Sequence, residues 1–124
     1  MRLKGFNLIE LRINKYKSLN EFTSQYVGEW APSNGHWYGL DFLYHGTEYR
    51  LHTGSMYKNG NTILPDGREA MFGLYKKIIK ELYGKYELLG EYADMHDLLE
   101  SRVIEGRSFA EVIMDDYTEL LGQY

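Results

Sequence analysis

The sequence predicts an α+β fold, in which a small antiparallel sheet made of a β-hairpin and an N-terminal strand packs against a helical C-terminal half. Three observations predict it. Residues 37–54 alternate as two strands around a short turn, residues 66–89 repeat apolar side chains at a helical period, and two more helical patterns follow. We therefore expect a single domain over 1–124, with 1–65 mainly β plus one short helix and 66–124 helical.

The hairpin is predicted from the pairing that a two-residue turn at His45-Gly46 would impose. This turn places Phe42 opposite Tyr49 and Asp41 opposite Arg50, and the opposite charges of the second pair favour the register. One face of the hairpin then carries mainly apolar side chains and the other mainly polar ones. We expect the first face in the core and the second in contact with water.

Shorter elements are predicted around the hairpin. Side chains alternate over 8–14, which predicts the N-terminal strand. Ser18 followed by Glu21 has the spacing of a capping box, and the apolar residues after it predict a helix that ends near Val27. A short edge strand is expected at 62–64.

The longest helix is predicted over 66–89, because its apolar residues fall on one half of a helical wheel and its charged residues on the other. Asp66 and Glu69 have capping-box spacing at its start. Gly84 and Gly90 are alternative positions for its end, and the sequence leaves this choice open. The width of the apolar half predicts that this helix packs on the sheet and on other helices at once.

Two more helices are predicted after Gly90. A stripe of apolar side chains up to Val103 predicts one of them, which closes near Gly106. Ser108 and Glu111 form a capping box for the other, which is expected to run to residue 121 with a glycine after it.

Composition excludes several classes of protein. The 124 residues contain no cysteine, which excludes disulfides, thiolate catalysis and cysteine-bound zinc. No segment approaches the roughly 18 apolar residues of a membrane span, and the N-terminal residues lack a signal-peptide pattern. We expect a cytoplasmic protein that does not associate with membranes.

Charge is distributed unevenly along the chain. Residues 1–86 hold 12 Lys and Arg against 8 Asp and Glu, whereas residues 87–124 hold 2 against 10. Like charges at i and i+4 on a helix are unfavourable by a few tenths of a kcal/mol, yet they recur here. The predicted helices would carry two acidic rows, formed by Glu87, Glu91 and Asp94 and by Glu111, Asp115 and Glu119.

Candidate catalytic groups form no recognisable pattern. The histidines lack metal-ligand spacing, and the glycines lack the spacing of a phosphate-binding loop. The sequence predicts no metal and no cofactor. The four histidines are His36, His45, His52 and His96.

The leading hypothesis is a small non-enzymatic protein that binds and inhibits or modulates a larger, basic, nucleic-acid-processing partner. The acidic rows would take the place of phosphates in a basic cleft, as in a phage or mobile-element inhibitor of the anti-CRISPR or anti-restriction kind. Two explanations without a binding partner compete with it. The acidic surface would only maintain solubility, or its carboxylates would pair with the protein's own basic residues.

Two other functions stay open at this stage. A small nucleic-acid-binding domain would use the lysine-rich face of the helix over 67–86, although the acidic net charge of −4 makes direct nucleic-acid binding the weaker prediction. An enzyme of undetected type would need a pocket that joins carboxylates with a histidine.

Trp37 and Arg50 suggest a second binding surface. Both fall on the water-facing side of the predicted hairpin, and tryptophan and arginine often anchor protein interfaces. The alternative is that other residues cover Trp37 and make it part of the core. The sequence does not decide between them, and it names neither the partner nor the oligomeric state.

Overall fold

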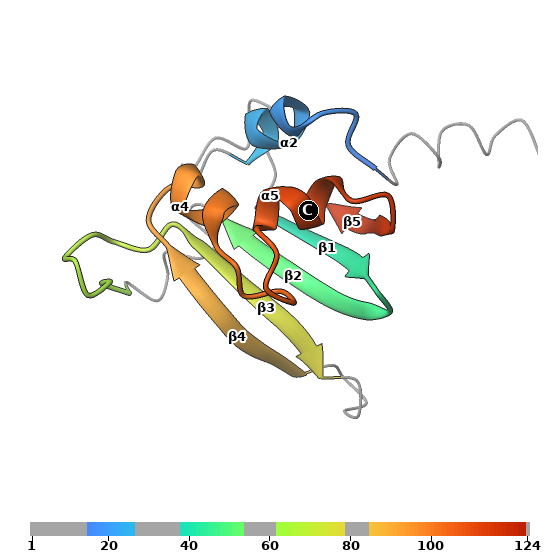
Figure 1. Cartoon of the computed structure of the whole chain (residues 1–124). Helices are drawn as coiled ribbons and strands as arrows, with labels where there is room; N and C mark the ends of the chain where they lie inside the picture. The colour runs from blue at the N-terminus through green and yellow to red at the C-terminus, as the bar shows by residue number, and fades with distance from the viewer. Residues whose placement is uncertain (1–14, 27–37, 54–61, 79–84, 124) are drawn as a thin grey trace, which may run out of the picture.

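The computed structural model describes residues 15–26, 38–53, 62–78 and 85–123, which form a five-stranded antiparallel sheet and three short helices (Figure 1). The strand order across the sheet is β4-β3-β2-β1-β5. Helices α4 and α5 lie on one face of the sheet, and α2 contacts α5. The elements are α2 (Leu19–Gln25), β1 (Gly39–Tyr44), β2 (Thr47–Thr53), β3 (Phe72–Ile78), β4 (Lys85–Tyr92), α4 (Met95–Glu100), α5 (Phe109–Met114) and β5 (Thr118–Gln123).

The predicted hairpin is confirmed, including its register. Strands β1 and β2 pair with Phe42 opposite Tyr49 and Asp41 opposite Arg50. The turn between them places His45 at φ 50° and Gly46 at φ 79°. Two successive residues with positive φ are typical of the type I′ turn, whose twist matches that of the strands it joins.

The helix predicted after Ser18 is also confirmed. The Ser18 hydroxyl accepts a hydrogen bond from the Glu21 amide at 3.1 Å, so it caps the first turn of α2. The Glu21 carboxylate accepts from the Lys17 amide at 2.6 Å, one residue before the position that a full capping box would use. The strand predicted over 8–14 lies outside the described residues.

The long helix predicted over 66–89 is wrong, because its two described parts are the antiparallel strands β3 and β4. Asp66 does not begin a helix: its carboxylate accepts from the Arg68 amide at 3.0 Å, within a turn in which Gly67 has φ 90°. The edge strand expected at 62–64 is reduced to one bridge between Ile63 and Glu69.

Pairing with β2 explains why a strand replaces the helix at Phe72. Strand β3 pairs with Tyr49 to Thr53 of β2, which buries Phe72 and Leu74 at two-residue spacing on the core side. A helix there would leave the edge of β2 unpaired. The helical period is real, but long-range pairing decides the structure.

The helix predicted over 108–121 is correct only at its start. The capping box is confirmed, with the Ser108 hydroxyl accepting from the Glu111 amide at 3.1 Å and the Glu111 carboxylate accepting from the Ser108 amide at 3.0 Å. The helix ends at Met114, and β5 then pairs with β1. The predicted helical C-terminal half is therefore wrong: it supplies three of the five strands, and its helices are short.

The core lies between the sheet and the helical layer. The ring of Phe109 in α5 lies 5.9 Å from Phe42 of β1 and 5.6 Å from Phe22 of α2, measured between centroids. These three rings are almost completely buried. They bring one residue from each of three separate segments into a single apolar contact.

A polar cluster joins β5 to α2 at the edge of this core. The Gln123 amide nitrogen lies 3.0 Å from the Tyr16 hydroxyl, 3.0 Å from the Gln25 side-chain oxygen and 3.1 Å from the Tyr26 hydroxyl. An NH₂ group has two hydrogens, so these three acceptors share two donors. Strand β5 is thereby connected by side chains to α2 and to the tyrosines on either side of it.

Strand β4 contains a close contact at Gly90. The register between β3 and β4 shifts near Leu74, and Gly90 then lies beside the ring of Tyr92. A Cβ added to Gly90 would lie 2.1 Å from the Tyr92 hydroxyl oxygen. That hydroxyl is buried and has no hydrogen-bond partner among the described residues. The absence of a side chain at Gly90 is what makes room for the tyrosine.

Candidate functional site: the open face of the sheet

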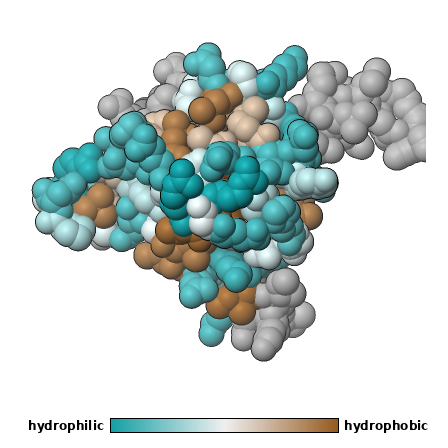
Figure 2. Space-filling model, in the orientation of Figure 1, coloured by the Kyte–Doolittle hydropathy of each residue, from teal (hydrophilic) through white to brown (hydrophobic). Residues whose placement is uncertain are grey.

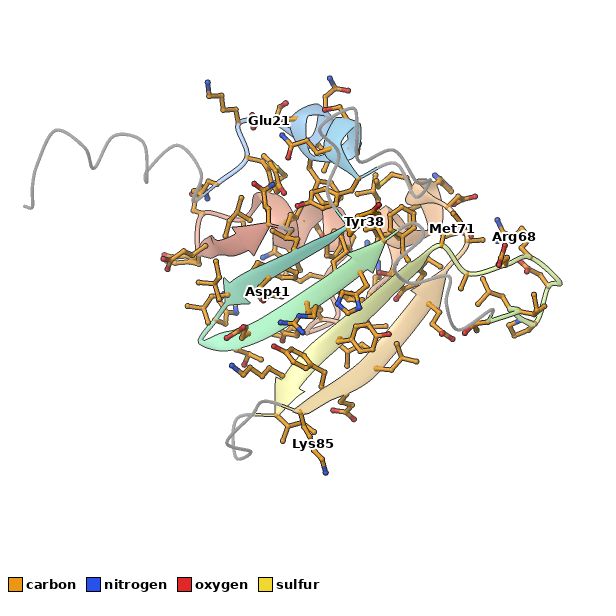
Figure 3. The ribbon with its side chains drawn as sticks, turned by 180° about the vertical axis from the view of Figure 1, so that it is seen from behind. Glu21, Tyr38, Asp41, Arg68, Met71 and Lys85 are labelled. Carbon is orange, nitrogen blue, oxygen red and sulfur yellow. The ribbon has the colours of Figure 1, made fainter. Side chains whose placement is uncertain are left out.

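The face of the sheet opposite the helices is the candidate site. Figure 3, seen from behind, shows side chains of β1 to β4 on this face, and none of the described helices covers it. We call it the open face. Its polar and aromatic residues include Asp41, Glu48, Arg50, His52, Tyr75, Lys77, Tyr86, Glu91 and Glu119.

Arg50 occupies the centre of the open face and is held from two sides. Its Nε donates to Asp41 Oδ1 at 2.8 Å, and its Nη2 donates to Asp41 Oδ2 at 3.0 Å. Its guanidinium carbon also lies 4.1 Å from the centre of the Tyr86 ring, a cation–π geometry. The side chains of Arg50 and Asp41 are 27% and 17% exposed, so the pair is partly shielded from water. A bidentate pair of this kind fixes the orientation of the guanidinium.

Two further pairs surround this arginine. The ring of His52 lies 5.4 Å from that of Tyr75, and the Lys77 ammonium lies 3.5 Å from the Glu48 carboxylate. Burial, followed by the nearby Arg50 charge, lowers the pKa of His52, so this imidazole is mostly neutral at pH 7.

The chemistry of this face suits recognition by contact. Two ion pairs on this face set two cations against two carboxylates, and its rings supply flat apolar area with polar edges. Arginine and tyrosine are the residue types that most often dominate the energy of protein interfaces. No group of three His, Asp or Glu side chains suited to a metal ion occurs among the described residues.

The sequence predicted part of this site. Arg50 was expected on the water-facing side of the hairpin, and the structure places it there beside Asp41. Trp37, the other residue predicted there, lies outside the described residues. Tyr75, Lys77 and Tyr86 were missed, because they were assigned to the long helix. The alternation of Phe72 and Leu74 around a glycine was the available signal for a strand.

The second predicted acidic row does not form, because its three residues belong to different elements. Glu111 is in the first turn of α5, Asp115 is the C-cap of that helix, and Glu119 is in β5 opposite Leu43. Only Glu119 projects from the sheet as an exposed carboxylate. The i, i+4 stacking expected of these residues depended on a helix that ends too early.

Asp115 and Glu111 already bind groups of this protein. The Asp115 carboxylate accepts from the Tyr117 amide at 2.8 Å and from Arg107, and these two contacts lower its pKa. Arg107 also donates to the Tyr44 hydroxyl at 2.9 Å. The hydrogen bonds from the Ser108 amide and hydroxyl lower the pKa of Glu111 in the same way.

The other predicted row is also divided between elements. Glu87 is exposed on β4 opposite Lys76, on the side of the sheet away from Arg50. Glu91 is half-buried in β4 opposite Gly73. Asp94 is the N-cap of α4, where it accepts from the Asp97 amide at 2.8 Å. Whether these residues bind a partner stays a prediction, but they do not form one row.

Much of the acidic surface is paired with the protein's own basic residues. Such pairing is one of the two explanations of the charge pattern that need no binding partner. Arg68 lies 3.1 Å from Asp94 and 2.6 Å from Asp97. Lys15 lies 3.9 Å from Asp116. Residues 94–116 hold seven Asp and Glu against two Lys and Arg, so a surplus of negative charge persists there.

The fold and the open face together define the class: a two-layer protein with a five-stranded antiparallel sheet covered on one side by short helices. No known protein family, curated protein or solved structure matches the chain. Within the described part of the chain, no helix is long and apolar enough to cross a membrane.

Proposed function

We propose that this protein is a non-enzymatic binding protein that docks on a larger partner protein through its open face and modulates that partner. The observation that carries the proposal is the fixed position of Arg50 between Asp41 and Tyr86. A side chain that is already ordered loses little conformational freedom on binding, which favours affinity.

A protein is a better match to this face than a nucleic acid. Backbone phosphates are bound by unpaired cations, whereas Lys77 lies beside Glu48 and Arg50 is bound to Asp41. Lys76, the other lysine of β3, is opposite Glu87. The lysine-rich helical face proposed for nucleic acid depended on a helix that is replaced by two strands.

The chemistry of the partner is suggested by the overall charge. The chain carries a net charge of −4, and residues 87–124 hold 10 acidic against 2 basic side chains. Electrostatic complementarity favours association with a basic protein, so a nucleic-acid-processing enzyme with a basic surface stays within the proposal. Inhibition by the anti-CRISPR or anti-restriction route is one form that this modulation would take.

The test compares two variants of residues on opposite sides of the sheet. Tyr86→Ala removes the ring under Arg50, whereas Lys76→Ala removes a charged side chain of the neighbouring strand on the other side. Affinity capture from cells of the native host should recover a partner with the wild type and with Lys76→Ala. The Tyr86→Ala protein should bind that partner at least about tenfold more weakly, which is about 1.4 kcal/mol.

Melting temperatures decide whether a loss of binding is a loss of fold. The proposal requires that Tyr86→Ala keep a circular dichroism spectrum and a cooperative transition like those of the control. Equal capture of the partner by both variants would refute it. A gel shift with single-stranded or duplex oligonucleotides at low salt, abolished by Tyr86→Ala, would assign the face to nucleic acid instead.

A further inference from the structure

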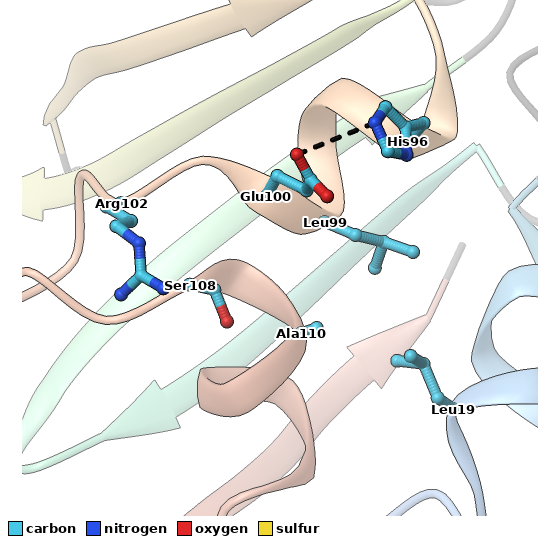
Figure 4. A pocket seen from close by; sticks show the side chains of 7 residues that line it. All are labelled: Leu19, His96, Leu99, Glu100, Arg102, Ser108 and Ala110. Atoms are coloured by element: carbon cyan, nitrogen blue, oxygen red, sulfur yellow. Dashed lines mark ion pairs between the residues drawn. The ribbon is translucent and has the colours of Figure 1, made fainter.

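A concave surface lies among the three described helices, on the side of the sheet opposite the open face. It encloses about 500 Å³, within the size range of sites that bind small molecules or side chains of a partner. Figure 4 shows that its lining comes from α2, α4, α5 and the segment between the last two. We call it the helical groove. Its lining residues are Leu19, His96, Leu99, Glu100, Arg102, Ser108 and Ala110.

The helical groove has an apolar part. Leu19 and Leu99 are partly buried against the core, and Ala110 adds only a methyl group, which keeps the space open. Figure 2 shows apolar patches between hydrophilic side chains on this side of the molecule. An apolar side chain inserted between Leu19, Leu99 and Ala110 would be removed from water, which favours binding.

Two long ion pairs lie on the charged rim of the groove. His96 Nε2 lies 3.5 Å from Glu100, and these side chains are 73% and 70% exposed. Arg102 lies 3.8 Å from Glu111, and these are 64% and 50% exposed. Long, exposed pairs contribute little to stability, so Glu100 can exchange its partner at small cost. Arg102 and Glu111 are held by further contacts, because Arg102 donates to the Gly106 carbonyl at 3.1 Å and Glu111 accepts from the Ser108 amide. The pair between Arg68 and Asp97, at 2.6 Å, is a tighter contact.

The charged side chains around the groove determine whether it favours a cationic or an anionic ligand. On the rim, the carboxylates of Glu100 and Glu111 outnumber the one guanidinium, that of Arg102. The seven acidic side chains of residues 94–116 likewise outnumber the four basic ones that lie in this segment or pair with it, which are Lys15, Arg68, Arg102 and Arg107. Glu100 is on the rim, where its ion pair is with a histidine. A positively charged ligand is therefore favoured over an anionic one.

From this geometry we infer that the helical groove binds a basic amphipathic peptide segment of a protein partner. One bulky apolar side chain of that segment fits between Leu19, Leu99 and Ala110, and a neighbouring lysine or arginine pairs with Glu100. This site is separated from the open face by the sheet, so it does not depend on the function proposed for that face.

The probe for this inference is a fluorescently labelled synthetic helix of leucine and lysine, with a leucine and glutamate peptide of the same apolar pattern as its counterpart. Fluorescence anisotropy measures both dissociation constants against the full chain. We expect the lysine peptide to bind at least tenfold more tightly than the glutamate peptide. Amide NMR shifts on addition of the lysine peptide should be largest at Leu99 and Ala110.

Two variants test the site itself, each with a different physical effect. Ala110→Gln fills the groove with a longer side chain that is compatible with a helix, and Glu100→Lys reverses the charge on the rim. Each should raise the dissociation constant of the lysine peptide at least tenfold. Glu87→Lys makes the same change of charge at an exposed position of β4 and should change it less than twofold.

The results separate this inference from a general attraction to negative charge. Equal weakening by Glu87→Lys and Glu100→Lys would overturn it, as would unchanged binding by a folded Ala110→Gln protein. Tyr86→Ala should leave binding of the lysine peptide unaffected. Loss of the open-face partner with intact peptide binding would therefore identify two independent sites.

Discussion

The ion pair at the centre of the open face should be measurably coupled in a double-mutant cycle. The variants are Asp41→Ala, Arg50→Ala and the double variant, and the measured quantity is the free energy of unfolding in urea. Two charge-assisted hydrogen bonds, at 2.8 and 3.0 Å, join side chains that are 17% and 27% exposed. Fully exposed pairs contribute roughly 0.2–1 kcal/mol, and breaking a buried pair costs roughly 3–5 kcal/mol. We therefore expect a coupling energy of about 1.5 kcal/mol.

Each single variant should be destabilised by more than this coupling energy. Removal of Arg50 also removes its contact with the Tyr86 ring, which the cycle does not assign to the pair with Asp41. The pair between Lys77 and Glu48, with one contact at 3.5 Å, provides a matched comparison and should be coupled by about 0.5 kcal/mol. A coupling energy for Asp41 and Arg50 no larger than that of the comparison pair would show that the bidentate geometry does not hold in solution.

Three further predictions concern stability. Gly90→Ala should lower the free energy of unfolding by about 1–3 kcal/mol, because the new methyl group meets the Tyr92 ring, and urea titration showing no change would contradict the contact. Ser108→Ala should cost about 1 kcal/mol in the same assay through loss of the N-cap, and a cost below about 0.3 kcal/mol would argue against the cap. A backbone amide and a guanidinium lower the pKa of Asp115 in the folded state. The stabilising effect of this carboxylate is therefore present above its pKa in the unfolded chain, near 3.9, and is lost as the pH falls through its pKa in the folded protein. Asp115→Asn should flatten the acid side of the stability curve below about pH 5, and an unchanged acid side in urea titrations at several pH values would contradict these contacts.

Local signals predicted the parts of the fold in which neighbouring residues determine the structure. The turn at His45-Gly46 fixes the register of β1 and β2, so the sequence was sufficient to pair Asp41 with Arg50. The cap at Ser108 likewise marks the start of α5. Both signals act over fewer than ten residues.

The sequence failed where distant segments determine the structure. Residues 72–78 satisfy a helical period and a strand period at once, and only the unpaired edge of β2 selects the strand. Thr118 to Gln123 join the sheet for the same reason, through pairing with β1. Part of the open face was missed as a result, since Tyr75, Lys77 and Tyr86 come from strands that the local pattern assigned to a helix.

The pairing of β5 with β1 has a consequence for how the chain is made. Strand β1 ends at Tyr44, yet the strand on its outer side begins only at Thr118. During synthesis, one edge of the apolar strand β1 stays unpaired until the segment that forms β5 has left the ribosome. Contacts between residues so distant in sequence also form slowly. A nascent chain of this protein therefore exposes a strand edge to other chains while the residues between Tyr44 and Thr118 are synthesised, and its yield in the cell should depend on chaperones that bind such edges.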